Sequence, residues 1–284
     1  MPYPDDPALR RRTLALLGRI WTKLGGAVDR ARGWGADWCE LSTPFLETDD
    51  AGSILAHVGI IPLPMLIDGR QLRFAGIHAV CTEAAQRGRG LMRAAMTRAL
   101  AHADAHYDGA VLWANDPAIY HRFGFVERGE SIFVGPVRGG TGELRPLALE
   151  RPEDLALLQN LLARRAPVSQ RCDVIDSAAL TLIDLALWQP GPSLAYLPDL
   201  DCVVSYAVRE RFVDLYDVIA PGPVALAELA ARLGEAIDTA VVYFSPDGLD
   251  APQLRPEPTV LIDPLMVRGP WCEEPFAVAP LRRC

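Results

Sequence analysis

The chain has 284 residues, of which 50% are hydrophobic and 23% are charged, and its formal net charge at pH 7 is −8. This composition excludes a disordered chain, and the length suits one large or two ordinary domains. The acidic balance argues against sequence-independent binding of nucleic acid, which depends on neutralising phosphates. It is compatible with a cationic amine as a substrate.

The cysteines and the apolar segments bear on where the protein works. The six cysteines are scattered without a Cys-x-x-Cys pair, which favours reduced thiols over disulfides or a zinc site, so no metal is expected. The N-terminal residues lack the apolar core of a signal peptide, and no apolar run reaches the roughly 18 residues that a membrane span needs. We therefore expect a cytoplasmic protein with no membrane association.

Periodicity predicts alternating helices and strands in the first half. Apolar residues at helical spacing predict a helix over 7–24, which Gly25 and Gly26 end or interrupt. Asp68-Gly69 is a hairpin signal. Pro62 and Pro64 indicate an edge or irregular strand, because proline cannot donate to a strand ladder. The other expected elements are a turn over 46–50, strands over 53–61, 71–82, 109–114 and 130–137, and helices over 90–106 and 116–122.

The most informative stretch runs from the strand that ends at Thr82 into the helix that begins near Leu91. The two are joined by Gln86-Arg87-Gly88-Arg89-Gly90, a glycine-rich and basic turn. The first N–H groups of a helix have no intrahelical partner, and the helix dipole favours negative charge there. Glycines let the backbone approach a ligand closely. The stretch therefore predicts a site for phosphate or pyrophosphate, although it fits neither the nucleoside triphosphate nor the dinucleotide fingerprint.

The turn matches Q/R-x-x-G-x-G/A, and downstream the segment Tyr120-His121-Arg122-Phe123-Gly124-Phe125 matches Y-x-[RK]-x-G-F. In these two motifs the chain resembles the GNAT superfamily of acetyl-CoA-dependent acetyltransferases, over roughly residues 45–135. The segment just upstream also resembles the tandem-GNAT "enhanced intracellular survival" type. The resemblance implies an α/β (α+β) fold with a mixed central sheet flanked by helices. That sheet opens after its central strand, and CoA lies in the gap.

The second half repeats the order strand, helix, strand, which predicts a second, degenerate GNAT-like lobe. We expect a catalytic domain over residues 1–137 and the degenerate lobe over 143–284, joined by a glycine-rich linker. The turn Ala220-Pro221-Gly222-Pro223 has two prolines where N–H donors are needed, so no CoA is expected there. The expected elements of this half are helices over 152–165 and 223–236 and strands over 202–208, 212–219, 239–244 and 258–268.

The resemblance also implies acetyl-CoA as a co-substrate and direct transfer of its acetyl group to a primary amine on a small molecule or peptide. The resemblance implies Tyr120 as the catalytic acid that protonates the departing thiolate. The base is not given by the resemblance, and His78 is one candidate from its position and its chemistry. His78 is expected on the same strand face as Val80 if the pleat is regular. The implied cofactor-binding residues are Val80, Cys81, Thr82, Arg87, Gly88, Arg89, Gly90, Leu91, Met92, Arg93 and Asn115.

Several alternatives remain open at this point. His57 and Glu83 are rival bases, Cys81 is not expected to act as a nucleophile, and the C-terminal Cys284 differs from the tandem relatives, whose terminal carboxylate can reach the active site. Tyr120 could instead pack in an aromatic cluster. A CoA-binding sensor or scaffold without catalysis is a second reading of the chain, and an enzyme using another acyl-CoA or an alcohol acceptor is a third. A homo-oligomer is possible, and the residues do not identify the acceptor.

Overall fold

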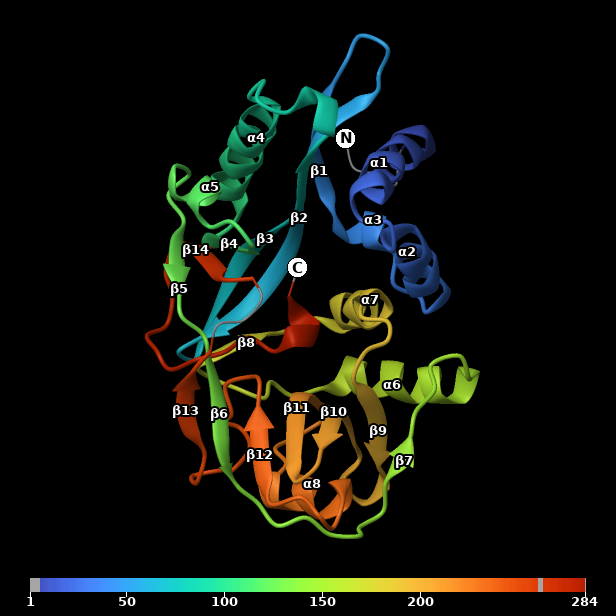
Figure 1. The fold of residues 1–284 in the computed structure, drawn as a ribbon, viewed down its shortest axis with the longest axis vertical. Helices are drawn as coiled ribbons and strands as arrows, with labels where there is room; N and C mark the ends of the chain where they lie inside the picture. The colour runs from blue at the N-terminus through green and yellow to red at the C-terminus, as the bar shows by residue number, and fades with distance from the viewer. Residues whose placement is uncertain (1–5, 260–262, 284) are drawn as a thin grey trace.

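The computed structural model describes residues 6–259 and 263–283, which form two lobes stacked along the long axis (Figure 1). Each lobe is built on a seven-stranded sheet. The first sheet has the order β1 (Thr43–Thr48), β2 (Ile54–Ile67), β3 (Arg70–Thr82), β4 (Gly109–Trp113), β14 (Leu265–Arg268) and β5 (Val126–Arg128), with β8 (Cys172–Val174) beside β2. The second has the order β13 (Arg255–Pro258), β6 (Ser131–Pro136), β12 (Thr239–Val242), β11 (Phe212–Ile219), β10 (Cys202–Arg209), β9 (Ser193–Leu197) and β7 (Arg145–Pro146).

Three short helices, α1 (Pro7–Ile20), α2 (Leu24–Gly33) and α3 (Trp38–Leu41), lie on one side of the first sheet (Figure 1). The Asp6 carboxylate caps α1 by accepting from the N–H groups of Ala8 and Leu9, each at 2.9 Å. The helix predicted over 7–24 is interrupted at Trp21, where the backbone leaves the helical region, and not at the glycine pair, which lies inside α2.

The hairpin β2–β3 is the longest feature of the first sheet and confirms the Asp68-Gly69 signal. Both turn residues have positive φ, 47° and 72°, as a two-residue type I′ turn requires. The turn expected over 46–50 is wrong in part, because β1 continues to Thr48 before the chain turns back into β2.

Pro62 and Pro64 are expected to mark an edge or irregular strand. β2 is not an edge strand as a whole, because it lies between β1 and β3, but it is irregular, with a register shift between His57 and Gly59. On the side of β1, moreover, β1 pairs only with 54–60 and β8 only with 65–67. The two prolines fall in the interval between these partners, where no ladder N–H is required. The rule for proline therefore holds locally.

A strand–helix–strand unit occurs once in each lobe, as the repeat in the sequence predicts. In the first lobe β3 leads through α4 (Leu91–His106) to β4, which pairs parallel to β3. In the second lobe β11 leads through α8 (Leu226–Leu233) to β12, again in parallel. Helix α4 and the short α5 (Ala118–His121) cover the face of the first sheet opposite α1–α3 (Figure 1).

The two sheets exchange one strand each. Strand β14, from the end of the chain, lies between β4 and β5 in the first sheet, and β6 lies in the corresponding place between β12 and β13 in the second. The strand expected over 130–137 therefore exists but belongs to the second sheet. The single strand expected over 258–268 is wrong in part: β14 forms its end, but β13 already stops at Pro258 and belongs to the other sheet. Residues 260–262 lie outside the described part. The division at 137–143 stays a prediction, and strands cross it in both directions.

Helix α7 (Ala178–Leu187), together with the C-terminal 3₁₀ turn η4 (Pro280–Arg282), lies between the lobes, and α6 (Pro152–Arg164) lies along the second lobe (Figure 1). The wholly buried guanidinium of Arg282 donates to Asp173 of β8 and to Asp217 of β11, so one side chain joins the two sheets. Arg165 shares Asp217 at 2.8 Å.

Candidate active site

The turn between β3 and α4 has the backbone that an anion site needs. Gly88 and Gly90 adopt φ of 77° and 78°, a region that favours glycine, and a Cβ added to either would meet nothing within 4 Å. Gly90 is the N-cap of α4 and gives no side-chain cap, whereas Asp6 caps α1. The first N–H groups of α4 therefore have no intrahelical partner.

Charge gathers at the same turn. The side chains of Arg87, Arg89 and Arg93 are exposed, and Arg89 donates to the Gln86 side-chain oxygen, which orders the turn from within. Leu91 and Met92 are half-buried, and Met92 packs against the core beneath α4. The structure thus brings the predicted residues 87–93 to one surface, with the arginines outward and Met92 inward.

A β-bulge interrupts the central strand where the resemblance predicts a carbonyl-binding backbone group. Ala79 and Val80 of β3 together face the single residue Val58 of β2, because the register shifts between His57 and Gly59. Ala79 has φ of 49°, a conformation that is uncommon for a residue with a Cβ and that clusters at functional sites. The His57 ring lies 2.8 Å through Nδ1 from the Ala79 carbonyl oxygen, so Nδ1–H donates to it and holds the bulge.

The bulge corrects the prediction that His78 and Val80 share a strand face. That prediction assumed a regular pleat, whereas the extra residue shifts the alternation by one position. Val80 now faces the core beneath α4 together with Ile77. His78 and Ala79 face the other side of the sheet, toward α3 and α7.

Strands β3 and β4 part just before the bulge. They pair only through 74–76 and 109–111, so beyond Gly76 the edge of β3 that faces β4 has no strand partner in the described part of the chain. The sheet therefore opens after its central strand, as the resemblance predicts. The bulge lies within this unpaired edge, and the glycine turn follows the end of β3.

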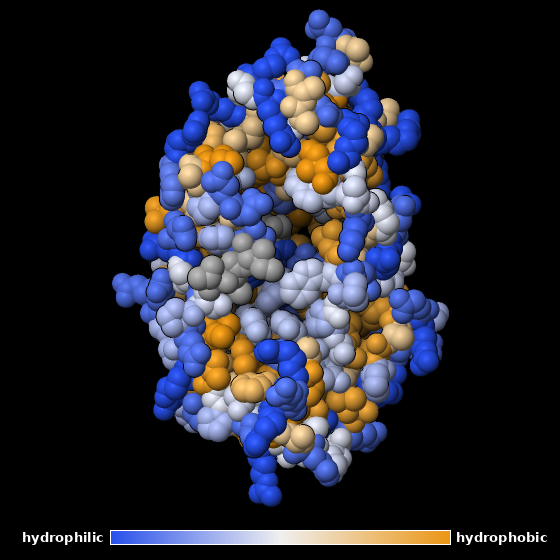
Figure 2. All heavy atoms as spheres, in the orientation of Figure 1, coloured by the Kyte–Doolittle hydropathy of each residue, from blue (hydrophilic) through white to orange (hydrophobic). Residues whose placement is uncertain are grey.

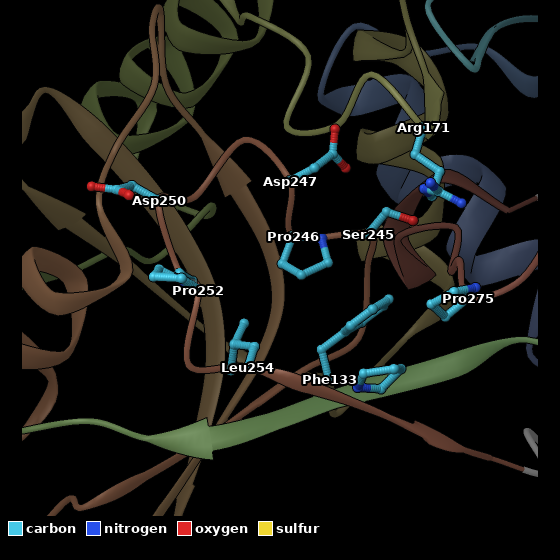
Figure 3. A pocket seen from close by; sticks show the side chains of 11 residues that line it. Phe133, Arg171, Ser245, Pro246, Asp247, Asp250, Pro252, Leu254 and Pro275 are labelled. Carbon is cyan, nitrogen blue, oxygen red and sulfur yellow. The ribbon is translucent and has the colours of Figure 1, made fainter.

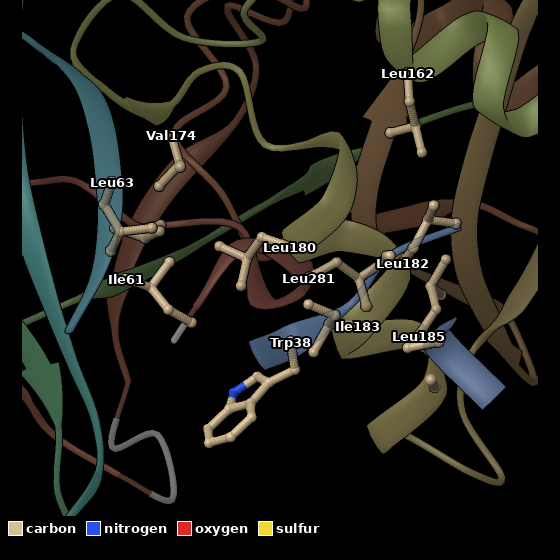
Figure 4. Packing of buried hydrophobic residues seen from close by; sticks show 14 of the residues in the cluster. Trp38, Ile61, Leu63, Leu162, Val174, Leu180, Leu182, Ile183, Leu185 and Leu281 are labelled. Atoms are coloured by element: carbon tan, nitrogen blue, oxygen red, sulfur yellow. The ribbon is translucent and has the colours of Figure 1, made fainter. Parts of the chain in front are cut away.

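On the face occupied by His78 a cavity of about 340 Å³ opens between α2, α3, α7 and the sheet. Most of its lining is apolar, and Trp38, Ile61, Leu180 and Ile183 come together there from three elements (Figure 4). The surface is hollowed near its middle, with hydrophobic side chains along one side of the hollow (Figure 2). The volume is at the low end of the range for small-molecule sites.

The candidate bases differ in their surroundings. His78 is 7% exposed, lines the cavity, and lies 2.8 Å through Nε2 from the Ser42 hydroxyl. Burial, with a smaller effect of His57, lowers the pKa of His78 well below 6.5, and burial lowers the pKa of His57 to about 4. Both imidazoles are therefore neutral near pH 7. The hydrogen bond from Arg19 lowers the pKa of Glu83, which does not line this cavity.

Asp184 of α7 also lines the cavity, and the sequence analysis missed it. Its Oδ2 atom is buried without a hydrogen-bond partner. Burial raises the pKa of this carboxyl well above its usual value, against the opposing effect of Arg283. One signal could have pointed to it: Asp184 is the only charged residue in α7, AALTLIDLAL.

The remaining predicted residues are placed as follows. Tyr120 is 9% exposed, and its ring packs edge-on against that of Phe125 with the ring centroids 6.2 Å apart. The aromatic packing that the sequence left open is therefore present. Burial, with a smaller effect of Asp116, raises the Tyr120 pKa to about 12. Asn115 is exposed beyond β4, and Thr82 is half-buried at the end of β3. Burial raises the pKa of Cys81 to about 12, so its thiol keeps its proton near pH 7.

A larger cavity of about 450 Å³ lies in the second lobe and contains none of the predicted residues (Figure 3). Its Asp247 already accepts from the Ser169 hydroxyl and the Gln170 N–H, at 2.5 Å and 2.7 Å. Elsewhere, none of the helices in the described part is both long and apolar enough to cross a membrane. The C-terminal Cys284, considered above, lies outside the described residues.

Comparison with known proteins shows which family and which fold the chain resembles. Residues 41–127 match the family model described as the acetyltransferase (GNAT) domain. Over 85 residues the chain is 31% identical to the uncharacterized N-acetyltransferase YhbS of Escherichia coli K12. The match covers 30% of this chain and 50% of YhbS, so the chain spans about half the length of the curated relatives it matches.

Two solved structures share the fold over most of the chain. A probable N-acyltransferase from Enterococcus faecalis V583 has a TM-score of 0.56 at 14% identity, over 81% of this chain and 62% of that one. Eis1 from Mycobacterium abscessus has a TM-score of 0.51 at 17% identity, over 79% and 63%. These two structures confirm the fold class that the motifs of the chain predict.

Proposed function

We propose that the protein is an N-acetyltransferase that moves the acetyl group of acetyl-CoA directly to a primary amine. The observation that carries the proposal is the bulge at Ala79 and Val80. It lies between a candidate binding site for the anionic cofactor and a mostly apolar cavity. On one side is the unpaired edge of β3 leading to the glycine turn, and on the other is the cavity lined by His78. The relative YhbS, matched by sequence, has been crystallised in complex with CoA.

In this proposal the turn residues 87–93 hold the pyrophosphate of acetyl-CoA through backbone N–H groups, supported by the exposed arginines. The pantetheine arm follows the unpaired edge of β3, where Asn115 contacts it, and the thioester reaches the bulge. A backbone N–H at Val80, beside Cys81 and Thr82, donates to the thioester oxygen as negative charge develops on it.

The amine enters from the cavity and attacks the carbonyl carbon, the C–S bond breaks, and the nitrogen loses one proton. His78, which lines the cavity and is neutral, accepts that proton, directly or through water. The Tyr120 phenol keeps its proton at neutral pH, because burial raises its pKa to about 12, and it protonates the thiolate. Amide and free CoA are the products.

The test measures release of the CoA thiol from acetyl-CoA with a panel of primary amines. Tyr120→Phe should lower kcat on the order of 100-fold, as expected for loss of a general acid, while leaving the Kd of acetyl-CoA within about twofold. Phe123→Leu, a change in the same half-buried aromatic cluster, serves as the packing control. Binding of acetyl-CoA without thiol release for any amine would instead favour the sensor or scaffold. Transfer from another acyl-CoA, or to an alcohol, would identify the third alternative.

A further inference from the structure

The cavity beside His78 has a mostly apolar lining with one acidic group, Asp184. This arrangement indicates which kind of ligand the cavity can bind. Asp184 projects from α7 into the space bounded by Trp38, Ile61 and Leu180. Its Oδ2 atom is buried and accepts no hydrogen bond, while the backbone of Arg283 hydrogen-bonds to the carboxyl group. A buried carboxyl oxygen without a donor is costly, so a cavity that presents one is suited to a ligand that supplies the donor.

We propose that this cavity binds an acceptor whose single basic nitrogen is carried on an apolar body, and that Asp184 binds that nitrogen. The inference rests on the proposed function, whose acceptor class it narrows. A primary amine supplies the N–H donors that Oδ2 lacks, and the apolar lining receives the rest of the molecule.

The other charged groups around the cavity leave Asp184 as the partner for a cation. Arg283 lines the cavity, but its Nη2 atom donates to Glu130 and to the Val278 carbonyl, each at 3.0 Å, and its guanidinium lies over Trp113. Lys23 is exposed, at the start of α2, and His78 is neutral.

The state of the carboxyl group agrees with this role. Burial raises the Asp184 pKa well above its usual value, so the empty cavity favours the protonated acid. When an amine enters, the proton is shared within a pair of no net charge, which an apolar cavity tolerates better than an isolated ion. A polyamine would bring further charges for which the lining offers no second carboxylate among the described residues.

An amine nitrogen bound by Asp184 would also lie in the cavity that the bulge residue Ala79 lines. His78 and Ala79 line the same cavity as Asp184, and Ala79 belongs to the bulge where the thioester is proposed to lie. An amine held by Asp184 therefore enters the reaction from the face of β3 opposite α4. Asp184 is an amine-binding residue in this account, and it takes no part in protonating the thiolate.

The test is calorimetric titration of the full chain without acetyl-CoA, using 2-phenylethylamine, 2-phenylethanol and spermidine as probes. We expect 2-phenylethylamine to bind, and 2-phenylethanol and spermidine to bind at least about tenfold more weakly. Asp184→Asn keeps the shape of the side chain and removes its charge, and it should raise the Kd of 2-phenylethylamine by at least about tenfold. The matched control Asp29→Asn removes an exposed carboxylate from α2 and should change nothing.

Equal affinity of wild type and Asp184→Asn for 2-phenylethylamine would overturn the inference, as would a preference for spermidine. Leu187→Trp, at a partly exposed position of the lining, provides a second variant. The larger side chain should narrow the cavity and so also weaken the binding of 2-phenylethylamine. Unaltered binding in this variant would place the amine elsewhere. If 2-phenylethylamine binds through Asp184 but no amine is acetylated, the proposed function fails, and the cavity remains an amine-binding site without an acceptor role. If acetylation occurs but amine affinity ignores Asp184, this inference alone fails.

Discussion

Replacing His57 with asparagine should remove a large part of the protein's sensitivity to acid. The His57 imidazole is wholly buried, its Nδ1–H donates to the Ala79 carbonyl at 2.8 Å, and burial lowers its pKa from 6.5 to about 4. The folded protein therefore keeps the ring neutral where the unfolded chain binds a proton. The contribution of His57 to stability is complete above pH 6.5 and is lost as the pH falls from 6.5 to about 4.

The expected magnitude follows from the size of the shift. A change from 6.5 to about 4 at roughly 1.4 kcal/mol per pH unit amounts to about 3 kcal/mol of unfolding free energy. Asparagine suits the substitution because its amide nitrogen can replace Nδ1 as the donor to Ala79 and does not titrate. At pH 7.5 the variant should therefore keep the bulge.

The assay is urea unfolding of wild type and His57→Asn between pH 7.5 and pH 4. Wild type should lose about 3 kcal/mol more than the variant over this range. His78 is present in both proteins, so its own contribution cancels in the difference to first order. His106→Gln, an exposed histidine on α4, is the control and should follow wild type. If the unfolding free energies of wild type and His57→Asn changed with pH in parallel, the assignment of the acid sensitivity to this ring would be refuted.

Two further predictions concern the cavity and the joint between the lobes. In Gly59→Ala the new Cβ would lie 2.3 Å from His78 Nε2, so the imidazole must leave its place beside Ser42. We expect kcat/KM for the amine to fall on the order of 100-fold while acetyl-CoA affinity is kept, and unchanged turnover would contradict a role for His78 in the reaction. Arg282→Met leaves two buried carboxylates without their shared partner and should cost about 3–5 kcal/mol in urea unfolding. Arg255→Met, an exposed control, should cost less than about 0.5 kcal/mol, and equal losses in the two variants would contradict the account of the joint.

Much of the fold could be predicted because its signals are local. The Asp68-Gly69 turn needs only two adjacent residues with positive φ, and the glycine turn into α4 is a contiguous motif. The exchange of β6 and β14 could not be predicted in this way. The alternation of apolar residues in a strand shows that it is buried but does not show which of two similar sheets it joins.

The candidate site was predicted in the same uneven manner. The motif identified the turn over 87–93, but placing His78 with Val80 failed because a bulge adds one residue and reverses the faces beyond it. Asp184 comes from the second half of the chain and reaches the cavity only through the packing of α7 between the lobes. Its isolation in an apolar helix was the one sign available in the sequence.

The measurement that tests the central claim most directly is calorimetric binding of acetyl-CoA to Gly90→Asp and Gly69→Asp. Both glycines have positive φ, 78° and 72°, with nothing within 4 Å of an added Cβ, so the two substitutions impose similar backbone strain. Only Gly90→Asp places a carboxylate where the pyrophosphate is proposed to lie. We predict that its Kd rises on the order of 100-fold or more while Gly69→Asp matches wild type. Equal affinity in all three proteins would contradict the claim that this turn binds acetyl-CoA.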